Sequence, residues 1–177
     1  MRGEVDFATS LRARIALLAG QPARLLERVK DLIELSSGAH TLVQTMKAHG
    51  AHTALVSGGF DVFTEVAAAA CGFDEHHANH LVLANGALSG EIGEPVLDRN
   101  AKQAILARLA VALGATPADA AAVGDGANDI PMIEAAGMGV AYRGKPKTAA
   151  AARFRLDHAD LTGLLYLQGY QAQEFHA

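Results

Sequence analysis

Apolar residues recur at helical spacing along the first part of this chain. Side chains such as Leu11 and Ile15 repeat every three or four positions, and glycines stand where the pattern stops. The spacing predicts helices over residues 10–19, 22–33 and 38–49. Because the leading helices precede every strand signal, we expect a separate helical cap, assigned to residues 1–37, whereas the helix over 38–49 is assigned to the following domain.

Short apolar runs then alternate with helical segments. The run 52–56 ends on a β-branched residue and predicts a buried strand leading into a tight loop at Ser57-Gly58-Gly59. Further strands are expected over 120–123 and 139–142. The helical segments of this part are 60–71, 100–113, 130–136, 147–152 and 161–170. Such alternation predicts an α/β fold, a parallel sheet with helices on both faces, over residues 38–177.

Two turn signals interrupt the region 78–94. Asn85-Gly86 and Ser89-Gly90 separate short apolar runs, which predicts a small β-hairpin excursion from the α/β core. His76, His77 and His80 fall between a predicted helix and the hairpin, and we expect them in a solvated loop rather than in a metal site.

Composition narrows the class of protein. The 177 residues are 50% apolar and carry a formal net charge of −4, which argues against a disordered chain and against a nucleic-acid partner. A single cysteine, Cys71, excludes an internal disulfide and a multi-cysteine zinc site. No apolar run has the length of a membrane span, and the charged start 1–7 does not resemble a signal peptide. We expect a cytoplasmic globular protein with no membrane partner; the sequence does not indicate the oligomeric state.

The strongest chemical signal is the loop Gly124–Asp129, directly after an expected strand. Its glycines allow a sharp turn and the close approach of a ligand. Asp125 is a hard oxygen ligand suited to Mg²⁺, and Asp129 would begin the next helix as a nearby support. The alternative is an Asp-Gly turn followed by an N-capped helix.

Two further signals suit an anion. Ser57-Gly58-Gly59 offers a hydroxyl and backbone N–H groups at a helix start, a suitable place for a phosphate oxygen. Lys102 stands near the start of a helix, where the macrodipole disfavours a cation and a phosphate partner would explain it. The alternatives are a glycine turn with a serine cap and a solvated surface lysine.

The Ser-Gly-Gly segment, the lysine and the acidic loop follow one another in the order of a known family, which the chain resembles over essentially its whole length. The matching stretches are MRGEVDFATSLRARIALLAG, ALVSGGFDVFTE, LSGEIGEPVLDRNAK and VGDGANDIPMIEAAGMGVAY. Through them the chain closely resembles the phosphoserine phosphatases of the haloacid dehalogenase-like superfamily. The resemblance implies a Rossmann-like parallel sheet, dependence on Mg²⁺, and hydrolysis of O-phospho-L-serine to serine and phosphate in serine biosynthesis.

The resemblance also implies roles for residues around the phosphate. The phosphate-binding serine and its neighbouring glycine fall on Ser57 and Gly58, and the lysine that balances phosphate charge falls on Lys102. The magnesium ligand falls on Asp125 and its supporting acid on Asp129. Ser57, Lys102 and Asp129 are therefore the candidate catalytic residues of this chain.

Four more positions are implied to contact the substrate. Asn128 matches a substrate-contacting asparagine, and Arg14 matches the cap arginine that holds the substrate carboxylate. A guanidinium suits that task because it can donate two parallel hydrogen bonds to a carboxylate. Met1 and Phe7 match cap residues that line the substrate pocket.

The family's opening motif, D-x-D-x-T, does not occur in residues 1–177. In the resemblance it supplies the first strand, the aspartate nucleophile and the acid/base aspartate, so we expect a truncated chain that hydrolyses little on its own. A catalytically inactive fragment that binds phosphate or phosphoserine, and a phosphatase for another small phosphomonoester, remain alternatives. A dinucleotide-binding domain is disfavoured because G-x-G-x-x-G fails at Asp129.

Overall fold

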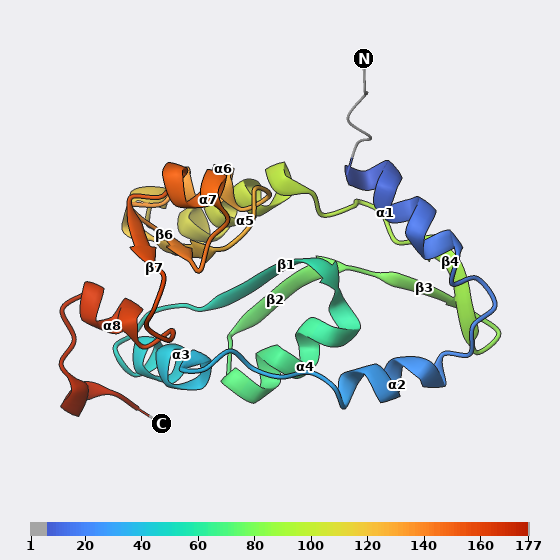
Figure 1. Cartoon of the computed structure of the whole chain (residues 1–177), viewed down its shortest axis with the longest axis horizontal. Coiled ribbons are helices and arrows are strands. Elements are labelled where there is room, and N and C mark those ends of the chain that lie inside the picture. Colours follow the sequence, from blue (N-terminus) through green and yellow to red (C-terminus); the bar gives the residue numbers. More distant parts are fainter. Residues whose placement is uncertain (1–6, 177) are drawn as a thin grey trace, which may run out of the picture. The chain divides into compact units, whose positions relative to one another are not determined.

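The computed structural model describes residues 7–176 (Figure 1). Within that range the chain divides into two compact units, residues 7–34 with 54–98 and residues 35–53 with 99–176. The assignment of residues 1–37 to a cap and 38–177 to a core stays a prediction. No helix of the described part is long and apolar enough to cross a bilayer.

The first unit contains a parallel strand pair, an antiparallel hairpin and three helices. These elements are α1 (Phe7–Ala16), α2 (Arg24–Lys30), β1 (Ala54–Phe60), α4 (Asp61–Cys71), β2 (Glu75–Asn79), β3 (Leu81–Ala84) and β4 (Ala87–Ile92). β1 pairs with β2, and β3 pairs with β4. The expected loop at Ser57-Gly58-Gly59 is wrong, because β1 continues through these residues to Phe60. Its register with β2 becomes irregular there, between Val56 and Phe60.

The hairpin packs against the leading helices. Asn85 and Gly86 both have positive φ, the backbone that a two-residue hairpin turn requires. Ser89-Gly90 is not a turn as expected but lies within β4, and at Gly90 a side chain would collide with Ala19. Buried apolar residues from helix and hairpin form one core cluster. Its members are Leu11, Ile15, Leu81, Leu88 and Ile92.

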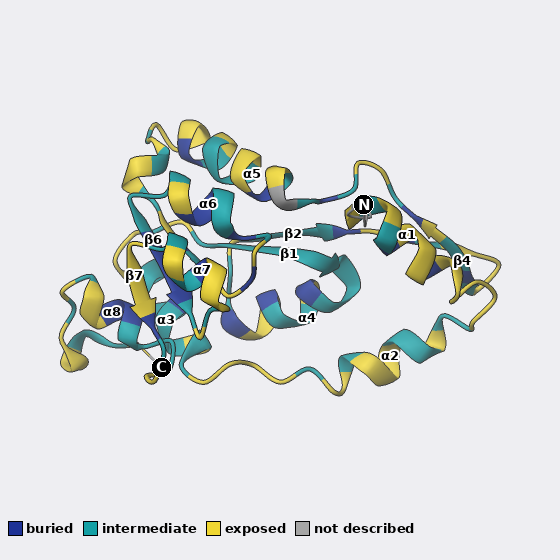
Figure 2. Ribbon diagram, turned by 45° about the horizontal axis from the view of Figure 1, so that its top comes forward, coloured by how far each residue is buried: buried dark blue, intermediate teal, exposed yellow. Residues whose placement is uncertain are grey.

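The second unit is built on a three-stranded parallel ladder in the order β5-β6-β7. Its strands are β5 (Ala121–Gly124), β6 (Met138–Tyr142) and β7 (Phe154–Leu156). Its helices are α3 (Ala39–Ala48), α5 (Arg99–Ala112), α6 (Ile130–Ala135), α7 (Pro146–Ala151) and α8 (Gly163–Leu167), with short 3₁₀ turns at Pro117–Asp119 and Ala172–Glu174. Val140 in β6 is fully buried and packs with Leu156 and Leu164. Figure 2 colours the buried residues of the chain dark blue. The fold is the expected α/β arrangement of parallel strands with flanking helices.

Two strands were not predicted. β2 holds His76 and His77, half-buried in a ladder, so the expectation of a solvated loop is wrong for this pair. His80 lies just beyond β2 and is exposed. β7 has three residues, of which only Leu156 is buried, so it leaves no periodic signal.

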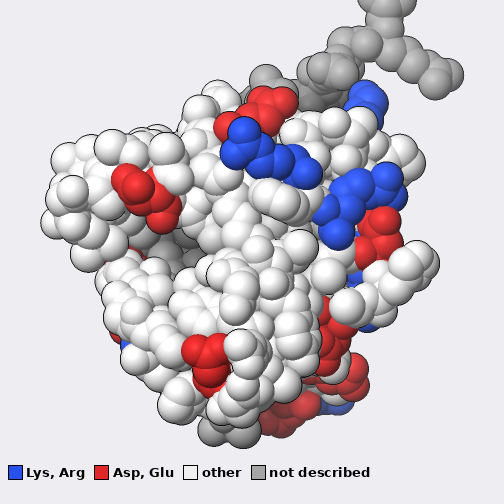
Figure 3. All heavy atoms as spheres, turned by 90° about the vertical axis from the view of Figure 1, so that its left-hand side faces the viewer, with Lys and Arg blue, Asp and Glu red and all other residues white. Residues whose placement is uncertain are grey.

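Charged side chains of both signs are scattered over one face with wide uncharged areas between them (Figure 3).

Candidate active site

The acidic loop of the second unit is folded around one carboxylate. β5 ends at Gly124, and Asp129 directly precedes α6. Its Oδ2 accepts hydrogen bonds from the backbone N–H groups of Asp125 (3.1 Å) and Gly126 (3.0 Å). The Asp129 side chain therefore turns back into the loop and makes no capping hydrogen bond to α6. The alternative prediction for this loop, a turn followed by an N-capped helix, is therefore wrong.

This geometry explains both glycines of the loop. A Cβ at Gly124 would lie 2.4 Å from the Asp129 Cβ, and one at Gly126 would lie 2.5 Å from the Asn128 Oδ1. Real Cβ atoms do not approach other atoms so closely, so neither position has room for a side chain. The glycines are needed because the two later side chains fold back over the loop.

Lys102, in the first turn of α5, binds the other oxygen of the same carboxylate. Its Nζ lies 2.6 Å from the Asp129 Oδ1, and the side chains are only 8% and 6% exposed. The alternative of a solvated surface lysine is therefore wrong. A buried ion pair is tolerated only when hydrogen bonds satisfy its charges. Here Asp129 accepts one charge-assisted bond and two backbone N–H bonds, which fixes the loop relative to α5.

Asp125 is the exposed carboxylate of this loop. It follows β5 at the carboxyl end of the ladder, and its carbonyl oxygen accepts the Lys145 N–H at 2.9 Å. In residues 7–176 no three His, Cys, Asp or Glu side chains gather as a ready-made metal cage. A single exposed carboxylate nevertheless fits Mg²⁺, which is commonly held by one or two carboxylates with waters and substrate phosphate. Asp129 would support this ligand, since both of its oxygens are already engaged.

In the first unit, the structure brings Phe7 and Gly58 together. A Cβ on Gly58 would lie 3.5 Å from the Phe7 Cζ, so the ring at the start of α1 lies against the Ser57-Gly58-Gly59 segment. The Ser57 Oγ accepts the Gly59 N–H at 3.0 Å, so this N–H is engaged within the segment. α4 begins only at Asp61, which places the segment in β1 rather than at the helix start that we expected.

The other residues that the resemblance assigns to the substrate are Arg14, Asn128 and Met1. Arg14 is exposed on α1, one residue before the buried Ile15. Asn128 is half-buried beside Gly126. Met1 lies outside the described residues.

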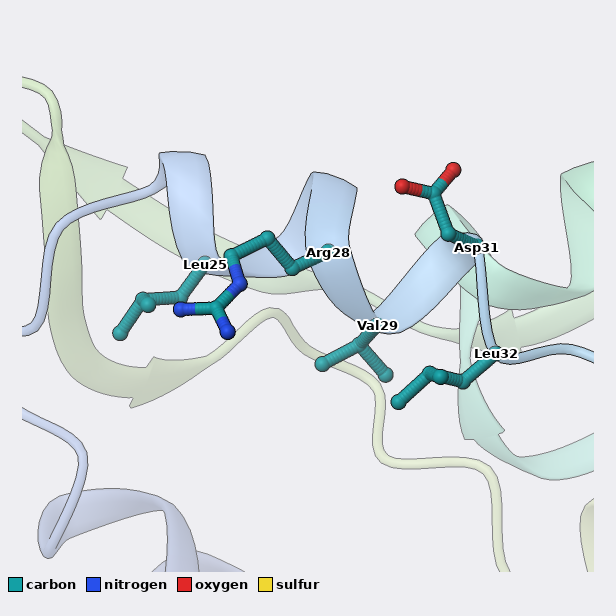
Figure 4. A pocket seen from close by; sticks show the side chains of 5 residues that line it. All are labelled: Leu25, Arg28, Val29, Asp31 and Leu32. Atoms are coloured by element: carbon teal, nitrogen blue, oxygen red, sulfur yellow. The ribbon is translucent and has the colours of Figure 1, made fainter.

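Two apolar hollows of the first unit contain none of the catalytic or metal-binding candidates. One lies on α2, where Leu25, Val29 and Leu32 line up with Arg28 while Asp31 points away (Figure 4). The other is enclosed by apolar side chains of α1, α2, α4 and the strands. Neither combines an apolar wall with several convergent polar groups, as ligand sites commonly do. The candidate residues of the acidic loop and of the Ser57 segment thus lie outside both hollows.

Asn79 is a polar residue that the sequence pattern did not single out. It ends β2 and is 1% exposed. Its side chain donates to the carbonyls of Gly58 and Gly59, the two residues that follow Ser57. Only the pairing of β2 with β1 brings these residues together, and β2 has no apolar periodicity that would have predicted it.

Comparison with known proteins identifies a family and several named relatives. The sequence model of the haloacid dehalogenase-like hydrolase family matches residues 2–134. A phosphoserine phosphatase of Streptomyces coelicolor is 41% identical over the whole chain, which covers 43% of that protein. One from Lactococcus lactis is 39% identical, with 93% of this chain and 76% of the relative covered.

A solved substrate-bound phosphoserine phosphatase complex has the same fold. It is 36% identical, its TM-score is 0.87, and 94% of this chain and 80% of that one are covered. The chain spans less than half the length of the Streptomyces coelicolor relative. With the family match extending over most of its length, the chain belongs to the haloacid dehalogenase-like hydrolases.

Proposed function

We propose that this chain forms the phosphate- and magnesium-binding part of a phosphoserine phosphatase, which releases phosphate from O-phospho-L-serine. The observation that carries the proposal is the buried Lys102–Asp129 pair, which holds the loop presenting Asp125. The relatives named phosphoserine phosphatase support the choice of substrate.

Each side chain has a distinct task in this proposal. Asp125 holds Mg²⁺, which when bound neutralises phosphate charge that builds up during transfer. Asp129 keeps the loop folded and keeps the Lys102 ammonium in place. An ammonium has three donor hydrogens, so Lys102 can bind a phosphate oxygen while it remains paired. The Ser57 hydroxyl and the adjoining backbone bind a second phosphate oxygen.

Contacts with the substrate's amino-acid end are assigned, by the family pattern, to individual residues. Arg14 grips the carboxylate, and Phe7 contacts the rest of the amino-acid end. Asn128 donates a further hydrogen bond to the substrate. A guanidinium that binds a carboxylate would select a phosphorylated amino acid over phosphomonoesters that lack this group.

The covalent step requires an aspartate that residues 1–177 do not supply in a D-x-D-x-T motif. The test therefore uses two proteins: residues 1–177, and an extended chain that includes this motif upstream in its own reading frame. Phosphate release from L-phosphoserine is measured with Mg²⁺ and with EDTA. We expect Mg²⁺-dependent turnover from the extended chain and little or none from residues 1–177.

Matched controls identify the substrate and the site. Phosphothreonine and homoserine phosphate test the alternative phosphomonoesters, and we expect both to be hydrolysed more slowly than phosphoserine. Asp125→Asn should abolish the Mg²⁺ response of the extended chain, whereas Lys147→Ala, on the exposed surface of α7, should not. An extended chain that folds and leaves phosphoserine intact would overturn the proposal.

A further inference from the structure

We propose that Asn79 is a positioning residue that orients the Ser57-Gly58-Gly59 segment for phosphate. The inference rests on the proposed function, because it assigns to Asn79 a role in the phosphate site. Asn79 itself does not touch substrate; it acts through the backbone of the two glycines.

The Asn79 side chain uses its hydrogen-bonding capacity on three backbone groups. Its Nδ2 donates to the Gly58 carbonyl at 3.0 Å and to the Gly59 carbonyl at 3.3 Å. Its Oδ1 accepts the Leu97 N–H at 2.7 Å. The residue is 1% exposed, so water cannot replace these partners without opening the unit. An asparagine amide is the only short neutral side chain with two donors on one atom and an acceptor beside them.

The β-ladder leaves the two glycine carbonyls in need of such a partner. Regular pairing runs as far as Val56 opposite His77 and resumes at Phe60 opposite Asn79. β1 thus advances four positions while β2 advances two. The two extra residues of β1 fall within the Ser57-Gly58-Gly59 segment. A bulge of this kind leaves backbone groups unpaired by the neighbouring strand. A carbonyl shielded from water and left without a partner destabilises the fold.

Holding the carbonyls also fixes the direction of the N–H groups. In a trans peptide the C=O and the following N–H point to opposite sides of the chain. Because the Gly58 carbonyl faces Asn79, the Gly59 N–H faces the other way, where it meets the Ser57 Oγ at 3.0 Å. Two successive glycines have the greatest backbone freedom of any pair, so this orientation needs an external constraint. Asn79 supplies that constraint from β2.

The experiment measures phosphate binding, which needs no turnover. Inorganic phosphate is titrated into the extended chain with Mg²⁺ by calorimetry, for the unchanged protein and for Ser57→Ala, Asn79→Ala and the double variant. Phosphate affinity should fall about tenfold in each single variant, as expected for loss of one hydrogen bond to an anion. Because the glycine backbone that Asn79 holds also orients the Ser57 Oγ through the Gly59 N–H, the double variant should be weakened no further than Ser57→Ala alone.

A matched variant separates positioning from stability. Thr64 is 7% exposed in the same unit, and its hydroxyl bonds His76 Nδ1 at 3.0 Å, away from the two glycines. Thr64→Val should lower the melting temperature but leave phosphate affinity and the KM for phosphoserine unchanged. Asn79→Asp, nearly isosteric, keeps the core filled; its ionised form has no donor, so it should also lose affinity.

The outcomes distinguish the two proposals. If Ser57→Ala leaves phosphate affinity unchanged, the assignment of Ser57 in the proposed function is wrong. If Ser57→Ala weakens binding while folded Asn79→Ala and Asn79→Asp bind phosphate normally, Asn79 is only structural and this inference fails. Additive losses in the double variant would also overturn it, because they would show that the two residues act independently.

Discussion

The Lys102 ammonium and the Asp129 carboxylate form a buried ion pair whose Nζ and Oδ1 atoms lie 2.6 Å apart. Removing the cation alone leaves a buried carboxylate without its charged partner. Lys102→Met should therefore lower the free energy of unfolding by about 3–5 kcal/mol.

Neutralising Asp129 as well should recover much of that loss. In Lys102→Met/Asp129→Asn, no buried charge remains and the amide oxygen can still accept the loop N–H groups. Urea unfolding of both variants measures the difference. A single variant that costs less than the double one would contradict the account of the pair.

The collision distance at Gly124 predicts a second effect. Gly124→Ala places a methyl group against Asp129, and the loop must move to admit it. We expect a loss of about 1–3 kcal/mol in stability, the usual cost of overpacking, together with weaker Mg²⁺ binding by the extended chain. Gly114→Ala is the control, because its Cβ meets nothing within 4 Å and only its positive φ is strained. Mg²⁺ affinity that falls equally in both variants would show that the contact with Asp129 is irrelevant.

The two arginines of α1 should behave differently. Arg12 bonds Glu94 through Nη2 at 2.5 Å, whereas Arg14 is assigned to the substrate carboxylate. Arg14→Ala should raise the KM for phosphoserine about 10- to 100-fold, the equivalent of one or two charge-assisted hydrogen bonds. Arg12→Ala should leave KM nearly unchanged. O-Phosphoethanolamine, which lacks the carboxylate, should not distinguish Arg14→Ala from the unchanged chain; if it does, Arg14 has another role.

Asp160 should contribute to stability in a pH-dependent way. The Thr162 hydroxyl, with smaller contributions from the Thr162 N–H and the Ser37 hydroxyl, lowers the pKa of Asp160. The folded state therefore favours the carboxylate. This contribution is fully present above the unfolded pKa of about 3.9 and is lost as the pH falls through the lower, folded pKa.

Asp160→Asn should thus lower the free energy of unfolding at pH 7 and lower it progressively less in acid, by a modest amount because solvent screens this carboxylate. Urea midpoints between pH 7 and pH 3 measure this change. Thr162→Val, which removes the hydroxyl donor, should have a smaller effect of the same sign. A pH-independent loss in Asp160→Asn would mean that its charge does not matter.

The acidic loop could be predicted because its information is local. Gly124, Asp125 and Asp129 lie within one turn between a strand and a helix, so their spacing alone places two carboxylates together. The sequence did not show which carboxylate would be engaged. That depends on Lys102, which belongs to another helix, and on backbone N–H groups that take their direction from the finished turn.

β2 could not be predicted because nothing local specifies it. Its residues E-H-H-A-N lack apolar alternation, and the strand exists through pairing with β1 and contact with α4. Asn79 and its bonds to the glycines are hidden for the same reason. Ser89-Gly90 was instead predicted as a turn but lies within β4. A glycine is needed at position 90 because Ala19 lies too close for a side chain there.

The joint between the hairpin and the segment after α1 is made by main-chain atoms. The Gly20 N–H donates to the Leu88 carbonyl, the Leu88 N–H to the Gln21 carbonyl, and the Ala23 N–H to the Gly86 carbonyl. Each bond needs only a backbone N–H, so proline at a donor position would remove it. Gly20 is further restricted by its positive φ, and Leu88 by its burial in the core cluster. The exposed side chains of this region can therefore be randomised in directed evolution without loss of the main-chain bonds. These bonds keep the hairpin attached to the segment that follows α1, the helix that carries Arg14.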